Sequence, residues 1–487
     1  MNNRALVALA LCAAALVSAA ARHAALPEVA WPDECIYLVG ARNVVERGTL
    51  DTNFYLTYSL LRRGHPHRDV HMPGYTLALA PFVAALGPTL QAGAALNVAL
   101  FCGCAILVCA LARGLALDRA QAAAAALLFT VLPPFPGYLF VVYPEIVVAF
   151  ALLLFLAWTA HAHGVKGAAV AGALYAAGAL FRETQLAALP VALARFSRRE
   201  MLRGFAPAAV ATLALAVAPM AHDRAVHPNA LYPSVLEDAR RSEAPVATLV
   251  SAVARNVAAN VRLTAAARPW ASAEDAVLLL FLALAIAAAL VSLRGEAPRE
   301  RRMFARAVLL SLAILTVAVL AVYVVRERGG VWGGVRVFMP WAPVLLVLAI
   351  PARPRTWRAV AMAVVLAAAF VGLDRWQVGF FNRYKGTDLE DQRRNAEYIG
   401  RYIDRYRPHR IVSRSFLYGL THYPVEVVWS LPRDGDELAA LNAAVGYEFL
   451  AIHERSPLRS VLIGNPRYAR VNKDDRGAEF LIWRRLY

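Results

Sequence analysis

The sequence predicts an all-α polytopic membrane bundle of about 11 transmembrane helices, followed by a small C-terminal α/β domain. Hydrophobic residues make up 59% of the 487 positions and charged residues only 17%, which no soluble domain of this length requires. Apolar runs recur along the first three quarters of the chain, at lengths that suit a hydrocarbon core about 30 Å thick. We therefore expect a transmembrane domain at residues 1–374 and a soluble domain at residues 375–487.

The apolar runs give the expected spans in chain order. The first run, Ala5–Ala21, has features of a signal peptide, but many spans follow it and we interpret it as a retained helix. The run Gly74–Gly87 is only fourteen residues long, so we expect an interfacial or re-entrant helix there. The expected spans are 4–21, 90–112, 119–135, 143–160, 166–181, 185–194, 204–221, 273–293, 304–325, 337–352 and 357–374.

Arginine clusters between the spans set their direction. Under this assignment the clusters all fall on one side, which the positive-inside rule makes cytoplasmic. The same rule accounts for the net charge of +17 without nucleic acid as a partner. The first loop, residues 22–90, and the soluble tail are then extracytoplasmic. The clusters are Arg113 and Arg119; Arg195, Arg198, Arg199 and Arg203; Arg294, Arg299, Arg301, Arg302 and Arg306; and Arg353, Arg355 and Arg358.

The tail after about residue 375 changes character. Charged residues become frequent, and one helical pattern, Leu389–Arg405, is followed by short β-prone runs. These runs are Arg410–Val412, Glu426–Trp429, Phe449–Ile452 and Glu479–Trp483. They predict a small α/β domain.

An acidic pair lies in the first loop, within Asp33-Glu34-x-x-Tyr37. Adjacent carboxylates near a membrane surface cost free energy if they are buried without partners, so they indicate a function. The alternative is a solvated loop in which Asp33 caps a helix over Glu34–Gly48. The neighbouring Cys35 lies in this polar loop without an obvious partner.

Two further motifs fall on the same predicted side of the membrane. The first loop closes with His71-x-Pro73-Gly74-Tyr75, directly before the short apolar helix. Glu145 begins the span that follows the second outer loop. The order and common side of these motifs indicate a single extracytoplasmic site.

Together these motifs resemble the GT-C glycosyltransferases, most closely the branch of the protein O-mannosyltransferases and the lipid A aminoarabinose transferase. The similarity in motifs is concentrated in residues 31–75 and 143–145, whereas the many-span bundle with an outer C-terminal domain extends it to the whole chain. Three positions depart from the family pattern and leave the donor sugar open: Cys35, Met72 in place of a proline, and Gly74.

The resemblance implies an inverting transfer of a sugar from a polyprenyl-phosphate donor to an acceptor hydroxyl. Asp33 is then the general base that accepts the hydroxyl proton. Glu34 and Glu145 orient the acceptor, the base or nearby cations. Tyr37 and Tyr75, which belong to the same motifs, are expected to bind substrate.

Fixed cations are expected to stabilise the leaving phosphate. The candidates are Arg182, which interrupts the short spans 166–181 and 185–194, Arg336, which precedes a span, and His71. For Arg182 the alternatives are an interfacial arginine or an ion pair with Glu183. For Arg336 the alternative is an interfacial anchor, and for His71 a hydrogen bond to the loop backbone.

The sequence thus predicts a multi-pass glycosyltransferase of a bacterial inner membrane, with its active site and C-terminal domain facing the periplasm. The expected partners are membrane lipids, the polyprenyl-phosphate sugar and a lipid, glycan or protein acceptor. No cluster of ligands demands a metal, and dependence on a divalent metal stays open. The alternative is a transporter or lipid flippase, which would carry ionisable residues in the middle of its spans.

Overall fold

The computed structural model of the chain falls into two compact units, each described here by itself. The helical unit comprises residues 1–26, 94–221 and 232–384, and the sheet unit comprises residues 27–93, 222–231 and 385–487. The structure describes residues 10, 12–18, 20, 32–50, 54–56, 67–68, 73–133, 135–215, 247, 250–251, 254, 258, 280, 283–290, 298–322, 337–350, 389–413, 423, 425–429, 432, 434–472 and 480–486.

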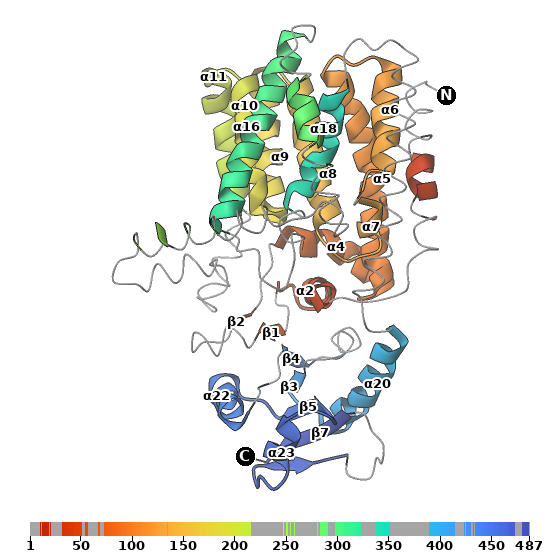
Figure 1. Cartoon of the computed structure of the whole chain (residues 1–487), viewed down its shortest axis with the longest axis vertical. Helices are drawn as coiled ribbons and strands as arrows, with labels where there is room; N and C mark the ends of the chain where they lie inside the picture. The colour runs from red at the N-terminus through yellow and green to blue at the C-terminus, as the bar shows by residue number, and fades with distance from the viewer. Residues whose placement is uncertain are drawn as a thin grey trace. The chain divides into compact units, whose positions relative to one another are not determined.

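The helical unit consists of helices that run side by side (Figure 1). Short helical pieces join the longer ones, and η2 continues as α-helix to residue 215. The helices are α5 (Leu90–Gly114), α6 (Arg119–Thr130), α7 (Phe135–Tyr138), α8 (Glu145–His161), α9 (Gly164–Phe181), η1 (Glu183–Ala188), α10 (Leu189–Arg195), α11 (Arg198–Glu200), η2 (Met201–Phe205), α16 (Arg299–Val322), η3 (Met339–Trp341) and α18 (Ala342–Ala349).

Two of the described helices, α5 and α9, are long and apolar enough to cross a membrane. Helix α8 and the continuous η3–α18 segment are apolar but shorter. The predicted spans between residues 90 and 194 each contain helix, whereas 4–21 and 273–293 are described only in part and 357–374 lies outside the described residues. The number of about 11 spans stays a prediction.

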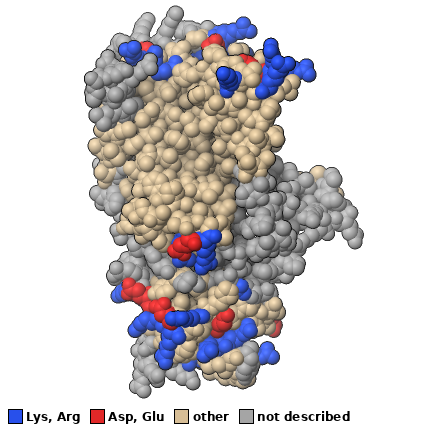
Figure 2. All heavy atoms as spheres, turned by 180° about the vertical axis from the view of Figure 1, so that it is seen from behind, with Lys and Arg blue, Asp and Glu red and all other residues tan. Residues whose placement is uncertain are grey.

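The surface of the helical unit separates apolar from basic side chains. Helices α5, α8, α10 and α16 end or begin together at one end of the unit (Figure 1), and lysine and arginine gather at that end while a broad surface beside it is uncharged (Figure 2). This pattern is typical of helices that meet hydrocarbon along their length and anionic headgroups at one end. Large apolar side chains of the helical unit that are exposed include Ile106, Leu127, Trp158, Val170, Leu193, Leu202, Leu310, Ile314 and Val317.

The sheet unit is built on a seven-stranded sheet of order β2-β1-β4-β3-β5-β7-β6. The four strands β1, β4, β3 and β5 are parallel, and β2, β7 and β6 pair antiparallel. All four β-prone runs of the tail form strands, and β1, β2 and β6 were not predicted. The strands are β1 (Phe54–Leu56), β2 (His67–Arg68), β3 (Arg410–Ser413), β4 (Glu426–Trp429), β5 (Phe449–His453), β6 (Tyr468–Arg470) and β7 (Phe480–Arg485).

Helices cover both faces of this sheet, and neighbouring residues of a strand pack against opposite helical layers. In β3, Ile411 belongs to one core and Val412 to the other, as expected where successive side chains point to opposite faces. The first core packs α2 (Pro32–Arg47) and α20 (Leu389–Tyr406) on the sheet. The second packs α22 (Gly435–Val445) and α23 (Leu458–Leu462).

The first loop therefore folds together with the tail. Strands β1 and β2 extend the sheet, and Cys35, Ile36 and Val39 of α2 enter its first core. This grouping differs from a division of the chain at residue 374. The prediction that Cys35 lies in a polar loop is wrong, because the residue is helical and only 1% exposed.

The short helix expected over Gly74–Gly87 is present as α4 (Pro73–Leu86), a helix of 14 residues. It packs against α2 within the sheet unit. It ends where Gly87 takes a φ of +73°, a left-handed conformation that glycine adopts at little cost.

Candidate functional site

The acidic motif opens helix α2. Pro32 stands at the first helical position, where its missing N–H is no loss. The two carboxylates follow in the first turn, where the helix dipole favours negative charge. Glu34 is fully buried, and the side chain of Asp33 lies outside the described residues. A buried carboxylate is costly unless partners satisfy it, so Glu34 is held by its surroundings.

The acidic motif and the motif that closes the first loop contact each other through one tyrosine from each. The rings of Tyr37 on α2 and Tyr75 on α4 pack edge to face, with centroids 4.8 Å apart and an interplanar angle of 89°. Tyr37 is 7% exposed and Tyr75 is fully buried. Their contact fixes α4 against the helix that carries the acidic pair, and a direct contact of either ring with substrate stays a prediction.

A buried arginine that sequence reasoning missed lies on the same helix. Arg42 follows Glu34 by eight residues, a little over two turns of α2, and is 6% exposed. Its Nη1 and Nη2 each lie 3.5 Å from the carbonyl oxygen of Tyr423. Burial lowers the pKa of the Arg42 guanidinium, and the carboxylate of Glu46 acts in the opposite direction. Arg42 directly follows the apolar run Cys35–Ala41, and an arginine at the end of such a run was the available signal.

The helical unit holds the second pair of predicted site residues. Nη2 of Arg182 donates to Oε1 of Glu145 across 3.1 Å. Glu145 is fully buried and is the first residue of α8, where the dipole favours its charge. The side chain of Arg182 is 17% exposed. Sequence analysis named both residues but not their contact; the alternatives for Arg182 were an interfacial arginine or an ion pair with Glu183.

Arg182 lies at a break between the helices α9 and η1. The residue ends α9 with an extended backbone (φ −160°, ψ 129°), and η1 begins directly after it. Gln185, in η1, donates from Nε2 to the carbonyl oxygen of Val148 across 2.6 Å, which ties the break to α8. Gly178 leaves room for this, because a Cβ there would overlap the Gln185 side chain.

The segment that leads into Glu145 is also fixed. Asn97 of α5 is fully buried, and its Nδ2 donates to the carbonyl oxygens of Tyr138 and Val141 at 3.2 and 2.7 Å. These bonds hold the non-helical chain before α8. Sequence reasoning missed both amides, Asn97 and Gln185, although a polar residue inside an apolar run is itself a signal.

The structure thus brings together two pairs of the predicted residues, Tyr37 with Tyr75 and Glu145 with Arg182, each within its own unit. His71 and Arg336 lie outside the described residues. Among the side chains that the structure describes, no three His, Cys, Asp or Glu gather in a way that could hold a metal ion.

Comparison with known proteins gives a match at the level of the fold. No protein-family model and no curated protein matches the chain. Solved structures of the oligosaccharyltransferase from the archaeon Archaeoglobus fulgidus do match. The form tethered to an acceptor peptide aligns with a TM-score of 0.54 at 12% identity, over 91% of this chain and 69% of that one. AglB from the same organism, in complex with an inhibitory peptide and a dolichol-phosphate, aligns with a TM-score of 0.51 at 12% identity, over 92% and 69%.

These alignments span nearly all of this chain, and the matched protein is a GT-C enzyme. At this identity the likeness concerns the fold alone. The GT-C fold that the sequence motifs indicated is therefore confirmed.

Proposed function

We propose, from the GT-C fold of this chain, that it is an inverting membrane glycosyltransferase. It moves a sugar from a polyprenyl-phosphate donor to an acceptor hydroxyl on the extracytoplasmic side. The observation that carries the proposal is the buried pair of Glu145 and Arg182, with 3.1 Å between Oε1 and Nη2, at the break of a helix. Ionisable side chains buried in an apolar bundle are costly, and they mark functional sites.

The pair of Glu145 and Arg182 is suited to bind the phosphate of a lipid-linked donor. A guanidinium carries five N–H donors, so it can bind a carboxylate and a phosphate at the same time. Glu145 holds Arg182, and the arginine stabilises the charge that grows on the leaving phosphate. A lipid phosphate is also present in a neighbour of the same fold, whose structure contains dolichol-phosphate. His71 and Arg336 are assigned as further phosphate contacts by their motifs.

The acceptor is activated on α2. Asp33 accepts the proton of the attacking hydroxyl, while the new bond forms at the anomeric carbon and the bond to the lipid phosphate breaks. This single displacement inverts the sugar carbon. Glu34 positions the base, and the contact of Tyr37 with Tyr75 keeps α2 fixed on α4. The acceptor class is a lipid, a glycan or a protein, and the acceptor and inhibitory peptides bound to the neighbours support a protein.

Metal dependence is a separate question. One neighbour was solved with Zn and sulfate. In this chain the described residues contain no group of His, Cys, Asp and Glu that could hold a metal, and we assign none of them to that role. Turnover measured with a chelator, and again after Mg²⁺, Mn²⁺ or Zn²⁺ is restored, answers the question directly.

The location is the inner membrane of a bacterium, crossed by about 11 helices, with the site and the tail in the periplasm. Reporter fusions test it: a fusion after Asp374 reports an extracytoplasmic position, and fusions near Arg199 or Arg301 report a cytoplasmic one. A cytoplasmic tail would remove the sheet unit from the donor side and contradict the proposal.

Lipid analysis of a deletion strain tests the reaction. We expect a polyprenyl-phosphate sugar to accumulate, together with an acceptor that lacks one sugar. The purified protein should then transfer the sugar from the accumulated donor. Transport of that lipid across vesicles without any transfer would instead establish the flippase class.

A further inference from the structure

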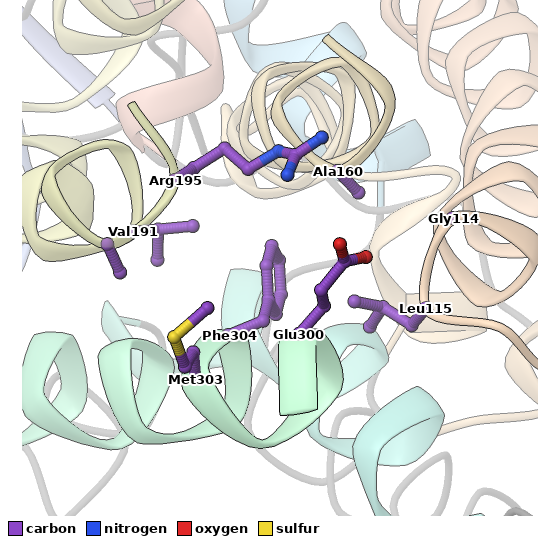
Figure 3. Close-up of a pocket in the computed structure, with 9 residues that line it drawn as sticks. Gly114, Leu115, Ala160, Val191, Arg195, Glu300, Met303 and Phe304 are labelled. Atoms are coloured by element: carbon purple, nitrogen blue, oxygen red, sulfur yellow. The ribbon is translucent and has the colours of Figure 1, made fainter. Parts of the chain in front are cut away.

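A cavity lies at the basic end of the helical unit, where α5, α8, α10 and α16 meet (Figure 3). Its volume is about 90 Å³. Helix α8 runs from Glu145 to His161, so the cavity lies about 22 Å along the helix from the buried pair. It is therefore separate from the proposed catalytic site. Its lining consists of Gly114, Leu115, Ala160, Val191, Ala194, Arg195, Glu300, Met303 and Phe304.

Two opposite charges line this cavity without binding each other. Arg195 is held from behind, because its Nε donates to the carbonyl oxygen of Thr159 across 3.2 Å and its Nη2 contacts the ring of His163. Glu300 extends from the first turn of α16 into the same space (Figure 3). Within the described part of the chain, no hydrogen bond or ion pair joins Glu300 to Arg195. The space between them suits a group that carries both charges.

The charges select the headgroup. Basic side chains around the helix ends attract a phosphate, and Arg195 is placed to bind it. The carboxylate of Glu300 repels a second negative charge and attracts an ammonium. A primary ammonium can also donate hydrogen bonds to this carboxylate, whereas a quaternary ammonium cannot.

The outer face of α16 indicates that the ligand is a lipid. Met303 lines the cavity and is 39% exposed. Leu310, Ile314 and Val317 continue from it as exposed apolar side chains, at 54%, 45% and 67%. Their spacing of seven, four and three residues keeps them on one helix face. This stripe gives an acyl chain a path away from the cavity.

We infer that the cavity binds the phosphoethanolamine headgroup of a membrane phospholipid. Its phosphate lies on Arg195, its ammonium lies on Glu300, and an acyl chain follows the stripe from Met303 to Val317. The site is independent of the proposed transferase reaction.

Lipid binding to the purified full-length protein, measured by native mass spectrometry, tests the assignment. The probes are phosphatidylethanolamine, phosphatidylcholine and phosphatidylglycerol with the same acyl chains, and free phosphoethanolamine. We expect phosphatidylethanolamine to bind about tenfold more tightly than phosphatidylcholine, the effect of one charge-assisted hydrogen-bonded contact. Free phosphoethanolamine should bind at least tenfold more weakly than the lipid, because it lacks the acyl contact.

Variants separate the two charges. Glu300→Gln should remove the preference for phosphatidylethanolamine over phosphatidylcholine and strengthen binding of phosphatidylglycerol. Arg195→Gln should weaken all three lipids, whereas Arg199→Gln, an exposed arginine of the same end that does not line the cavity, should change none. Equal affinity of the wild type for phosphatidylethanolamine and phosphatidylcholine would overturn the inference. So would a preference that survives in Glu300→Gln, whose exposed position keeps the substitution compatible with folding, or free phosphoethanolamine that binds as tightly as the lipid.

Discussion

The structure allows an estimate of the unfolding free energy that is lost when the ion pair of Glu145 and Arg182 is broken. The carboxylate is fully buried and its Oε1 lies 3.1 Å from Nη2, whereas the Arg182 side chain keeps 17% of its surface exposed. Removal of one partner of a buried pair costs about 3–5 kcal/mol, because the other charge stays in a medium of low dielectric constant. We expect Arg182→Ala to lower the free energy of unfolding by that amount. Glu145→Gln should cost less, about 1–3 kcal/mol, because the guanidinium that remains can reach water.

A double-mutant cycle measures the interaction itself. Unfolding in detergent micelles, followed by circular dichroism, gives the free energy of unfolding of each variant. Glu145→Leu and Arg182→Met are measured singly and combined. The double variant removes both charges, so it should destabilise the protein less than Arg182→Met does alone. Arg199→Ala, at an exposed arginine, is the control. Additivity of the two single substitutions within about 0.5 kcal/mol would show that the pair does not interact, and would refute the reasoning.

Four further substitutions test the acidic motif and the surroundings of Glu145 and Arg182. Asp33→Asn should lower turnover at least ~10²-fold with little change in donor affinity, and Glu34→Gln should be milder; the reverse order would move the base to Glu34. Gly178→Ala should displace the Gln185 side chain and cost about 1–3 kcal/mol of unfolding free energy, the range for overpacking, and wild-type stability would contradict the described fit. Asn97→Leu should lower the free energy of unfolding by about 1–3 kcal/mol, because two buried carbonyl oxygens lose their donor. Amide hydrogen exchange of the segment before α8 should become faster; an unchanged rate would show that other contacts hold this segment.

Most strands of the sheet could be predicted from the sequence, but the pairing of strands that lie far apart in the chain could not. Glu426–Trp429 was predicted to the residue, because a short run of β-prone side chains is a local signal. Phe54–Leu56 was missed because it is three residues long and pairs with Val427 and its neighbours, far away in the chain. No local pattern encodes a pairing of that kind.

In the candidate site, too, single residues could be predicted from the sequence but their contact could not. Glu145 and Arg182 were recognisable singly, one as an acidic residue at the start of a span and the other as a charge that interrupts an apolar run. Their contact was not, since it depends on how far the chain turns after α9. That turn is set by Gln185 and by the space at Gly178, which are tertiary contacts.

Cys35 shows why the acidic motif and the tail belong to one structure. A cysteine beside two carboxylates in a loop has no evident purpose, but on α2 it packs with Ile36 and Val39 against Ile411 and Phe449 of the sheet. The acidic pair occupies the first turn of the same helix, so the direction of its side chains depends on this core. The tail is thus part of the scaffold that holds the acidic motif, and a function of the motif requires the tail even if no tail residue contacts the substrate.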